Sequence, residues 1–255
     1  QNTSTGYGTL LLLAFLCGVG GGSFSGYMPS TGYFFPKSKQ GTALGVQAGI
    51  GNLGMSIVQL LGPWLMGFGL LGLTWIAPQH TAGSPLWVHN IAIVFVPWTI
   101  LATILAFTML KDVPVKANFR RQIDIFTNPD TWIMTLMYVM TFGLFSGFSA
   151  VFGLLINNQF GRESSLALPV LGATFAFLGP LIGSLIRMSW GIFCDRMGGA
   201  IWTLVSGVGL IASIAFTMTA LTPDTSSAAA LESGFTKFLW GMLAIFLFSG
   251  IGNAS

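Results

Sequence analysis

Seven long apolar stretches, separated by short polar connections, run along this chain. A helix that crosses a bilayer needs about 20 mostly apolar residues, and each stretch meets that length. Only 7% of the 255 residues are charged, against about 25% in a soluble domain. These features exclude a fold that is exposed to water on all sides. The sequence therefore predicts an all-α membrane protein whose backbone polar groups are satisfied inside helices.

The predicted spans are bounded by charged segments or by segments rich in Pro and Gly. They cover Gly8–Phe35, Thr42–Leu73, Asn90–Leu110, Thr131–Ile156, Leu166–Phe193, Ile201–Leu221 and Phe235–Ser255. The last span ends with the chain, and the chain has no initiator methionine. We therefore interpret the sequence as the middle of a longer protein, and we see no soluble domain in it.

The basic residues in the connections are distributed unequally between the two sides of the membrane. One side has seven of the 10 Lys and Arg residues: Lys37, Lys39, Lys111, Lys116, Arg120, Arg121 and Arg196. The other side has only Arg162 and Lys237. Because cytoplasmic loops carry the excess of Lys and Arg, the first side is predicted to be cytoplasmic. The first helix then enters a cell inner membrane from the periplasmic side. Since the charge forms no single patch, it does not indicate nucleic-acid binding.

Side chains that bind metals or perform catalysis are scarce at membrane depth. Cys17 and Cys194 lie in separate apolar stretches, and His80 and His89 have no third ligand nearby. The middles of the predicted spans contain no Asp, Glu or His, whereas a membrane protease or metalloenzyme needs such groups at depth. We expect no catalytic residue, no metal and no cofactor, and the protein is not predicted to be an enzyme.

Glycines are concentrated in about four turns of the second predicted span. The group comprises Gly41, Gly45, Gly49, Gly51 and Gly54, with the amide Asn52 among them. Glycine in a helix costs roughly 1 kcal/mol against alanine, and membrane helices use it where backbones approach closely. Two interpretations stay open. The glycines either pack against another helix, or they leave the backbone bare so that a small polar solute touches it.

Arg187 is the Lys or Arg residue that lies inside a predicted span. A charged side chain there costs from about 2.5 to more than 10 kcal/mol and needs a partner. The seven acidic residues all lie in connections or at span ends, so an anionic substrate is the predicted partner. A guanidinium donates two parallel hydrogen bonds to a planar oxyanion. The alternatives are snorkelling to the cytoplasmic interface, or an acidic partner beyond this chain.

Three aromatic residues are interpreted as walls of the same cavity. Phe24 lies in the small-residue stretch GGGSFSGYM, and Tyr138 and Phe142 are one turn apart in LMYVMTFGLFSGF. A phenol at membrane depth needs a hydrogen-bond partner, which an anion supplies. The alternative for Phe24 and for Phe142 is ordinary packing against lipid.

A tight turn with the pattern GxxxDRxGG follows the fifth predicted span. Its defining residues are Gly191, Asp195, Arg196, Gly198 and Gly199. Asp195 is predicted to cap the positive N-terminus of the next helix or to complement its charge, and Arg196 to hold a neighbouring helix end. The glycines allow the chain to turn sharply. We interpret this motif as a conformational latch.

These motifs together resemble the nitrate/nitrite porters (NarK-type) of the major facilitator superfamily. FFPKSKQGTALGVQAGIGNLG is similar to their nitrate signature, LMYVMTFGLFSGFSAVFG to their seventh helix and GPLIGSLIRMSWGIFCDRMGG to their eighth helix with its following loop. The resemblance implies a chain that runs from the fourth to part of the tenth of twelve expected helices. Residues 1–110 are then the last three helices of the N-terminal bundle, 111–130 the cytoplasmic inter-bundle loop and 131–255 the first part of the C-terminal bundle.

The resemblance implies a secondary transporter that moves nitrate, nitrite or both across the inner membrane by alternating access, in nitrate assimilation. The implied substrate-binding residues are Arg187, Asn52, Gly49, Gly51, Gly54, Tyr138, Phe142 and Phe24. The partners are then nitrate, nitrite, the lipid bilayer and the remaining helices of the same chain. A second arginine, from the first half of the family's fold, has no counterpart in this chain.

Three alternatives concern coupling, substrate and class. Exchange of nitrate for nitrite is favoured over proton symport because no titratable acid or histidine lies mid-membrane in these helices. A permease for another small anion, such as a carboxylate, keeps the fold and gives Arg187 a different partner. A membrane enzyme or a non-transporting sensor belongs to another class, and the sequence shows neither catalytic groups nor a signalling domain.

Overall fold

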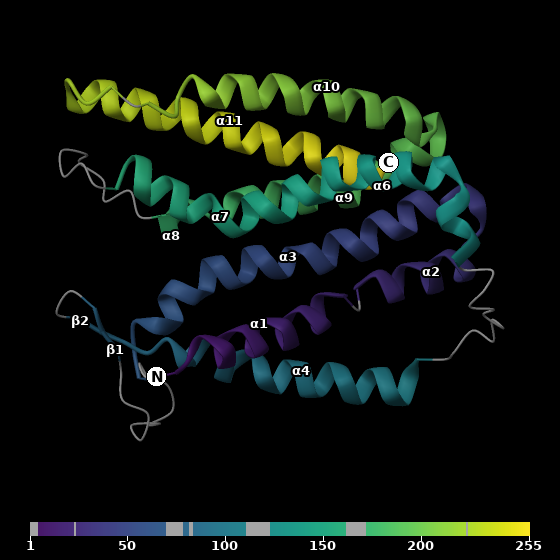
Figure 1. Ribbon diagram of the computed structural model, residues 1–255, viewed down its shortest axis with the longest axis horizontal. Helices are drawn as coiled ribbons and strands as arrows, with labels where there is room; N and C mark the ends of the chain where they lie inside the picture. The colour runs from purple at the N-terminus through teal and green to yellow at the C-terminus, as the bar shows by residue number, and fades with distance from the viewer. Residues whose placement is uncertain are drawn as a thin grey trace. The chain divides into compact units, whose positions relative to one another are not determined.

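In the part of the chain that it describes, the computed structural model contains helices and one small hairpin (Figure 1). It describes residues 5–22, 24–69, 79–81, 84–110, 123–161, 172–222 and 224–255. Two units are distinguished by their internal contacts. The first comprises Gln1–Gln40 and Trp64–Pro114, and the second comprises Gly41–Pro63 and Val115–Ser255. Each unit is described by itself.

The first unit contains helices with few buried side chains. Its elements are α1 (Tyr7–Gly22), α2 (Phe24–Phe34), the 3₁₀ turn η1 (Lys37–Lys39), the end of α3 (Gln40–Met66), the hairpin strands β1 (Gln79–Thr81) and β2 (Ser84–Leu86), and α4 (His89–Met109). None of the residues of α1 is buried. Apolar side chains on such helices are suited to contact with lipid or with other membrane helices.

One buried amide joins α3 to α4 within the first unit. Asn90 has no exposed surface, and its Nδ2 donates to the backbone oxygens of Leu65 at 2.8 Å and Phe68 at 2.7 Å. The final carbonyl groups of a helix have no partner inside the helix. Asn90 therefore satisfies one of these groups, that of Leu65, and the carbonyl of Phe68 just beyond α3, and it fixes the start of α4 against the end of α3.

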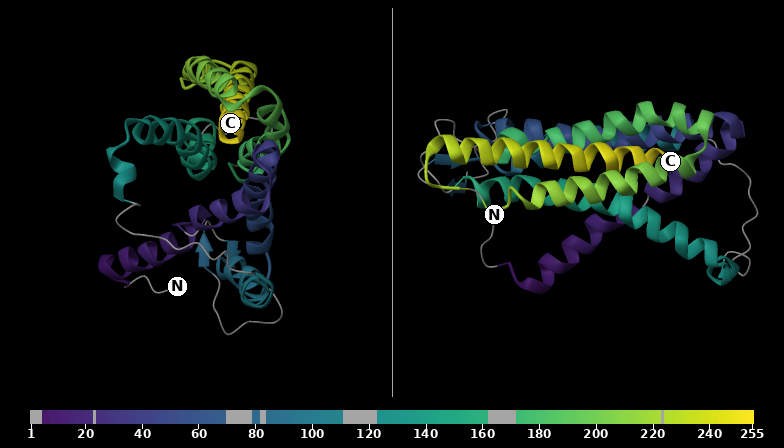
Figure 2. Two further views of the ribbon diagram at one scale, coloured as in Figure 1. Left: turned by 90° about the vertical axis from the view of Figure 1, so that its right-hand side faces the viewer. Right: turned by 90° about the horizontal axis from the view of Figure 1, so that it is seen from above.

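The second unit contains the remaining helices. They are the 3₁₀ turn η2 (Asp124–Thr127), α6 (Pro129–Tyr138), the π-helical turn η3 (Val139–Gly143), α7 (Leu144–Gln159), α8 (Gly172–Phe175), α9 (Leu178–Met197), α10 (Gly199–Met218) and α11 (Ala228–Ala254). Helix α11 packs along both α9 and α10. The two views in Figure 2 show α10 and α11 side by side. Residues 41–63 of α3 belong to this unit as well.

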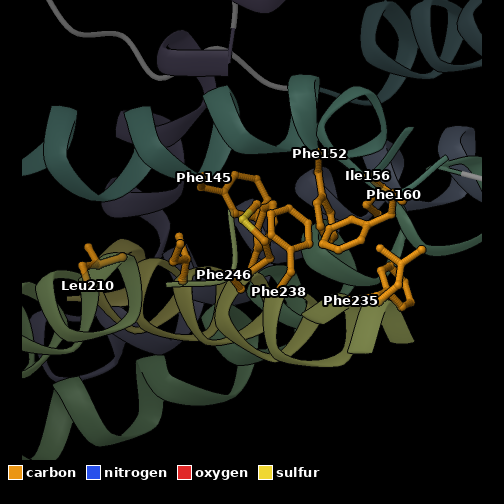
Figure 3. Close-up of a cluster of buried hydrophobic side chains, with 12 residues drawn as sticks. Phe145, Phe152, Ile156, Phe160, Leu210, Phe235, Phe238 and Phe246 are labelled. Atoms are coloured by element: carbon orange, nitrogen blue, oxygen red, sulfur yellow. The ribbon is translucent and has the colours of Figure 1, made fainter. Parts of the chain in front are cut away.

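Aromatic side chains form the core between α7 and α11. Figure 3 shows Phe145 and Phe152 of α7 pointing toward Phe238 and Phe246 of α11. Phe145 and Phe246 pack edge to face with ring centroids 5.8 Å apart, an arrangement that aromatic quadrupoles favour. Gly179 and Gly183 of α9 lie directly against these rings. Small residues on α9 thus let the aromatic core approach its backbone.

Six of the helices or helix runs are long and apolar enough to cross a membrane, by length and composition, among the described residues. They are Tyr7–Phe34, Lys37–Met66, His89–Met109, Pro129–Gln159, Gly199–Met218 and Ala228–Ala254. They correspond to all the predicted spans except the fifth, and an all-α multi-pass membrane protein is confirmed. The predicted end of the second span, Leu73, lies outside the described residues.

Two predicted spans differ from the observed helices. The fifth, Leu166–Phe193, contains α9 (Leu178–Met197), which is missing from that set because Arg187, Asp195 and several small polar residues lower its mean hydropathy. Its first residues lie outside the described part of the chain. Helix α11 begins at Ala228 rather than at Phe235, because the Ser227 hydroxyl caps it by accepting from the Ala230 amide at 3.1 Å. The predicted bundle boundary at 111–130 stays a prediction.

Candidate anion site on α9 and its latch to α3

Arg187 of α9 is a buried cation. Its residue is 2% exposed, and its guanidinium carbon lies 5.9 Å from the centroid of the Phe142 ring. The side chain of Tyr138 also interacts with the guanidinium. A cation over the face of an aromatic ring is stabilised by the ring quadrupole. The structure therefore brings together three of the residues predicted to bind substrate, from α9, α6 and η3.

The two aromatic residues form a stacked pair at a break in helix geometry. The rings of Tyr138 and Phe142 lie 5.1 Å apart with an interplanar angle of 12°. They border or belong to the π-helical turn Val139–Gly143 between α6 and α7, and such turns occur frequently at functional sites. The pair presents a flat apolar wall beside a buried cation, which suits a flat anion.

The glycine ridge of α3 packs against the backbone of α9. A Cβ atom on Gly45 would lie 2.9 Å from the carbonyl oxygen of Arg187. A Cβ on Gly49 would meet the Met188 side chain and lie 2.9 Å from the carbonyl oxygen of Ser184. Close helix packing is therefore what Gly41, Gly45 and Gly49 provide in this structure. A contact between the Gly49 backbone and substrate stays a prediction.

The other residues of the nitrate signature divide between two faces of α3. Asn52 is 5% exposed, follows Gly49 by one turn on the same face, and its Nδ2 has no hydrogen-bond partner among the described residues. Gly51 and Gly54 lie on an exposed face, and a Cβ on Gly54 would meet nothing within 4 Å. Asn52 is thus the signature residue with an unused buried donor, and roles for Gly51 and Gly54 in binding stay predictions.

Phe24 belongs to the first unit, which is described by itself. It is the half-buried first residue of α2, in the first unit. Its predicted contact with the substrate therefore stays a prediction.

Asp195 forms the long-range contact of the latch motif, with a partner that differs from the predicted one. Its Oδ1 accepts from the Gly41 amide at 2.8 Å, and its Oδ2 accepts from the Thr42 amide at 2.8 Å and the Thr42 hydroxyl at 2.6 Å. The prediction that Asp195 caps the next helix, α10, is wrong. It caps α3, because the close fit of Gly191 against Gly41 brings the end of α9 to the first turn of α3.

Hydrogen bonding holds the Asp195 carboxylate in its charged form. Partial burial alone raises its pKa, but the bonds donated by Thr42 and Gly41 outweigh that effect and lower the pKa below its ordinary value. A carboxylate at the N-terminus of a helix is also favoured by the helix dipole. The charged latch is therefore the stable form at neutral pH.

The remaining latch residues shape the turn. Gly198 has a φ of 86°, which residues with a side chain rarely adopt. Gly199 begins α10, and a Cβ there would lie 2.7 Å from the backbone oxygen of Ser255. Arg196 is exposed, so its predicted hold on a neighbouring helix end stays a prediction.

Two polar residues of α3 that the sequence pattern did not single out continue the helix face of Asn52. Ser56 is 3% exposed, and Gln59 donates from Nε2 to the carbonyl oxygen of Ser149 at 2.7 Å. Together with Asn52 they occupy positions i, i+4 and i+7, which share one helix face. This spacing is visible in the sequence and indicates a polar helix face, but the glycine pattern of the same stretch overlaps it.

Comparison with known families identifies one match over nearly the whole chain. Residues 3–255 match the model of the Major Facilitator Superfamily. A probable nitrate/nitrite antiporter, NarK2, of Thermus thermophilus is 52% identical over 260 residues, covering 100% of this chain and 57% of the relative. The nitrate/nitrite transporters NarU of Salmonella typhimurium and Escherichia coli are 36% and 35% identical, over 100% of this chain and 53% of each relative. The chain thus spans about half the length of these curated relatives.

Proposed function

We propose, on the premise that this chain belongs to the Major Facilitator Superfamily, that the whole protein exchanges nitrate for nitrite across the inner membrane. The observation that carries this proposal is the buried guanidinium of Arg187 beside the stacked rings of Tyr138 and Phe142. The names of the relatives supply the substrate, since they are described as nitrate/nitrite antiporters or transporters.

The chemistry of these side chains suits a small planar oxyanion. A guanidinium donates parallel hydrogen bonds in the plane of an oxyanion, while the aromatic faces cover it and exclude water. The unused Nδ2 donor of Asn52 supplies a further hydrogen bond. A second cation, contributed by helices beyond this chain, completes the site. In this scheme the protein acts as a transporter and not as an enzyme.

Alternating access gives the latch a role. Residues 1–110 belong to one bundle and 131–255 to the other, joined by the loop 111–130, and the bundles rock around the anion. The bonds from Asp195 to α3 hold the two bundles together on the side that carries most of the Lys and Arg residues. That side is cytoplasmic, so the first helix enters from the periplasm.

The test of this function is nitrate uptake by the full-length protein with Arg187 replaced. Arg187→Ala should abolish uptake, and Arg187→Lys should reduce it by at least about tenfold, because lysine keeps the charge but loses the planar fork. The measurement is exchange of labelled nitrate against internal nitrite in proteoliposomes, normalised to the amount of reconstituted protein.

Ser189→Ala is the control for this experiment. Ser189 is exposed on the same helix, and its hydroxyl bonds only to carbonyls of that helix among the described residues, so exchange should remain at the wild-type rate. If Arg187→Lys exchanges nitrate at the wild-type rate, bidentate hydrogen bonding by Arg187 is contradicted. Wild-type exchange by Arg187→Ala would remove the anion site itself.

A further inference from the structure

We propose that Gln59 is the gate residue at the end of α3 opposite the Asp195 latch, and that substrate reaches the anion site past it; this inference rests on the proposed function. Its hydrogen bond to the Ser149 carbonyl, at 2.7 Å, joins α3 to α7 across 90 positions of sequence. A gate of this kind closes when the amide of Gln59 is bonded to α7 and opens when the two helices separate.

Helix α3 is bonded at two distant points to helices that follow the loop 111–130 in the sequence. Gly41 and Thr42 are bound by Asp195 at its first turn, and Gln59 is bound to α7 near its other end. At 1.5 Å per residue, these two points are about 25 Å apart along the helix axis. The close backbone contacts of Gly45 and Gly49 with α9 lie between them. A rigid helix that pivots about that contact must lengthen one of the end bonds as it shortens the other.

The face of α3 between the anion site and Gln59 is polar and not fully bonded. Asn52 and Ser56 are more than nine-tenths buried. Asn52 Nδ2, Ser56 Oγ and Gln59 Oε1 all lack a hydrogen-bond partner within the described part of the chain. Buried polar atoms are nearly always satisfied by protein or by water. A row of such atoms along one face therefore marks a path that water and a small anion occupy.

A hollow lies at the point where this path meets the bond between α3 and α7. It has a volume of about 470 Å³ and is lined by residues of both helices, among them Gly54, Gln59, Ser146 and Ser149. The absence of a side chain on Gly54 keeps this hollow open. When Gln59 leaves the Ser149 carbonyl, its Nε2 becomes the first donor that an oxyanion entering the hollow meets.

The strength of the bond suits a gate. Hydrogen bonds between membrane helices are weak, so losing one changes the ratio of open to closed states by roughly threefold, and at most by roughly twentyfold. A contact of that size holds the gate closed at rest and yields to the rocking of the bundles.

The test measures the separation of α3 and α7 in the full-length protein in lipid nanodiscs. Spin labels are placed at Leu60 of α3 and Leu154 of α7, which are 50% and 59% exposed, and their distances are measured by electron–electron double resonance without nitrate. Gln59→Leu removes the donor, and Gln59→Glu keeps the length but replaces the donor by a carboxylate that the Ser149 carbonyl repels. Both variants should raise the fraction of the long distance by roughly threefold or more.

Gln40→Leu is the matched control. Gln40 is the first residue of α3, and its Nε2 donates at 2.8 Å to the carbonyl oxygen of Gly32, a bond of the same type that does not involve α7. It should leave the Leu60–Leu154 distances unchanged. An unchanged distribution in either Gln59 variant, or an equal opening in Gln40→Leu, would overturn the gate.

The distance measurement also separates this inference from the proposed function. If the wild-type protein exchanges nitrate but the distances are unchanged in the Gln59 variants, the gate is contradicted and the proposed function stands. If α3 and α7 separate in both Gln59 variants but the wild-type protein exchanges no nitrate, the gate stands and the proposed function is contradicted. If Gln59→Leu does not fold, Gln59→Glu alone decides.

Discussion

Two charged side chains of α9 lie less than three turns apart and have different surroundings. Arg187 is buried against Phe142, whereas Asp195 lies at the end of the helix and binds the first turn of α3. Both charges are placed where the protein offers a group of opposite polarity or a polarisable ring. A charge on a membrane helix persists only under such conditions, and these contacts account for the presence of both charges on α9.

The pKa of Asp195 predicts that the latch is insensitive to pH in the physiological range. Because the folded-state pKa is lowered by the bonds from Thr42 and Gly41, despite burial, the bonds are fully present above the ordinary pKa of about 3.9. They are lost as the pH falls through the lowered folded-state value. Amide hydrogen exchange of the peptide containing residues 41–42, corrected for intrinsic rates, should show constant protection from pH 5 to 8.

The variant Asp195→Asn tests the same latch at neutral pH. An amide has one acceptor oxygen, so one of the two α3 amides loses its acceptor, and protection should fall by about tenfold. Asp224→Asn is the control, since Asp224 is exposed and accepts a bond from Ser226 in its own loop. Equal protection in Asp195→Asn and wild type would show that the carboxylate does not hold α3.

At the scale of elements, α3 and α9 approach through backbone rather than through side chains. The Gly41–Gly45–Gly49 ridge fits against Ser184, Arg187 and Gly191. Because these glycines have no side chains, the backbones of α3 and α9 lie close enough for Asp195 to bond to the first turn of α3. Membrane helices lack a hydrophobic driving force for association, so close van der Waals packing of small residues takes its place. The latch therefore depends on the ridge.

Two alanine substitutions on α3 test this dependence. Gly45→Ala places a Cβ 2.9 Å from the Arg187 carbonyl, and the backbone must move, at a cost of about 1–3 kcal/mol. Gly54→Ala meets nothing within 4 Å and should be neutral or stabilising by up to about 1 kcal/mol. Thermal unfolding of the detergent-solubilised full-length protein should give a lower Tm for Gly45→Ala only. Equal Tm values for both variants would contradict the packing.

At the scale of the whole molecule, the arrangement of charge bears on energy coupling. Among the described residues, the acidic side chains lie in loops or at helix ends, and His89 is the first residue of α4. Proton-coupled transporters use chains of acidic or histidine side chains within their spans. The described helices offer a buried guanidinium instead, which fits the proposed exchange of two anions without a proton.

Exchange without proton movement is the resulting prediction. Nitrite-loaded proteoliposomes containing the full-length protein should take up nitrate at the same rate with and without a pH gradient. An internal pH dye should report no proton uptake during influx. Proton uptake in proportion to nitrate influx would establish symport and place the titratable group in helices beyond this chain.

Local pattern alone was enough to predict six of the seven spans, the buried cation and the turn with its positive-φ glycine. Apolar length determines which stretches cross a membrane, and a lone Arg in such a stretch demands a partner wherever the helix is placed. The aromatic pair Tyr138 and Phe142 followed from a one-turn spacing. These features depend on neighbours within a few residues, so they can be read from the sequence.

Tertiary structure decided which surfaces meet. The sequence allowed Asp195 to cap the helix that follows it, but its partners Gly41 and Thr42 are 154 and 153 positions away. It left the glycine ridge open between packing and substrate contact, and only the tertiary structure shows that Gly45 and Gly49 pack closely against α9. Its spacing placed Gln59 on the same helix face as Asn52 and Ser56, but not against its partner Ser149, which lies on another helix. Periodicity specifies the face of a helix, but the partner of that face depends on how all the helices pack together.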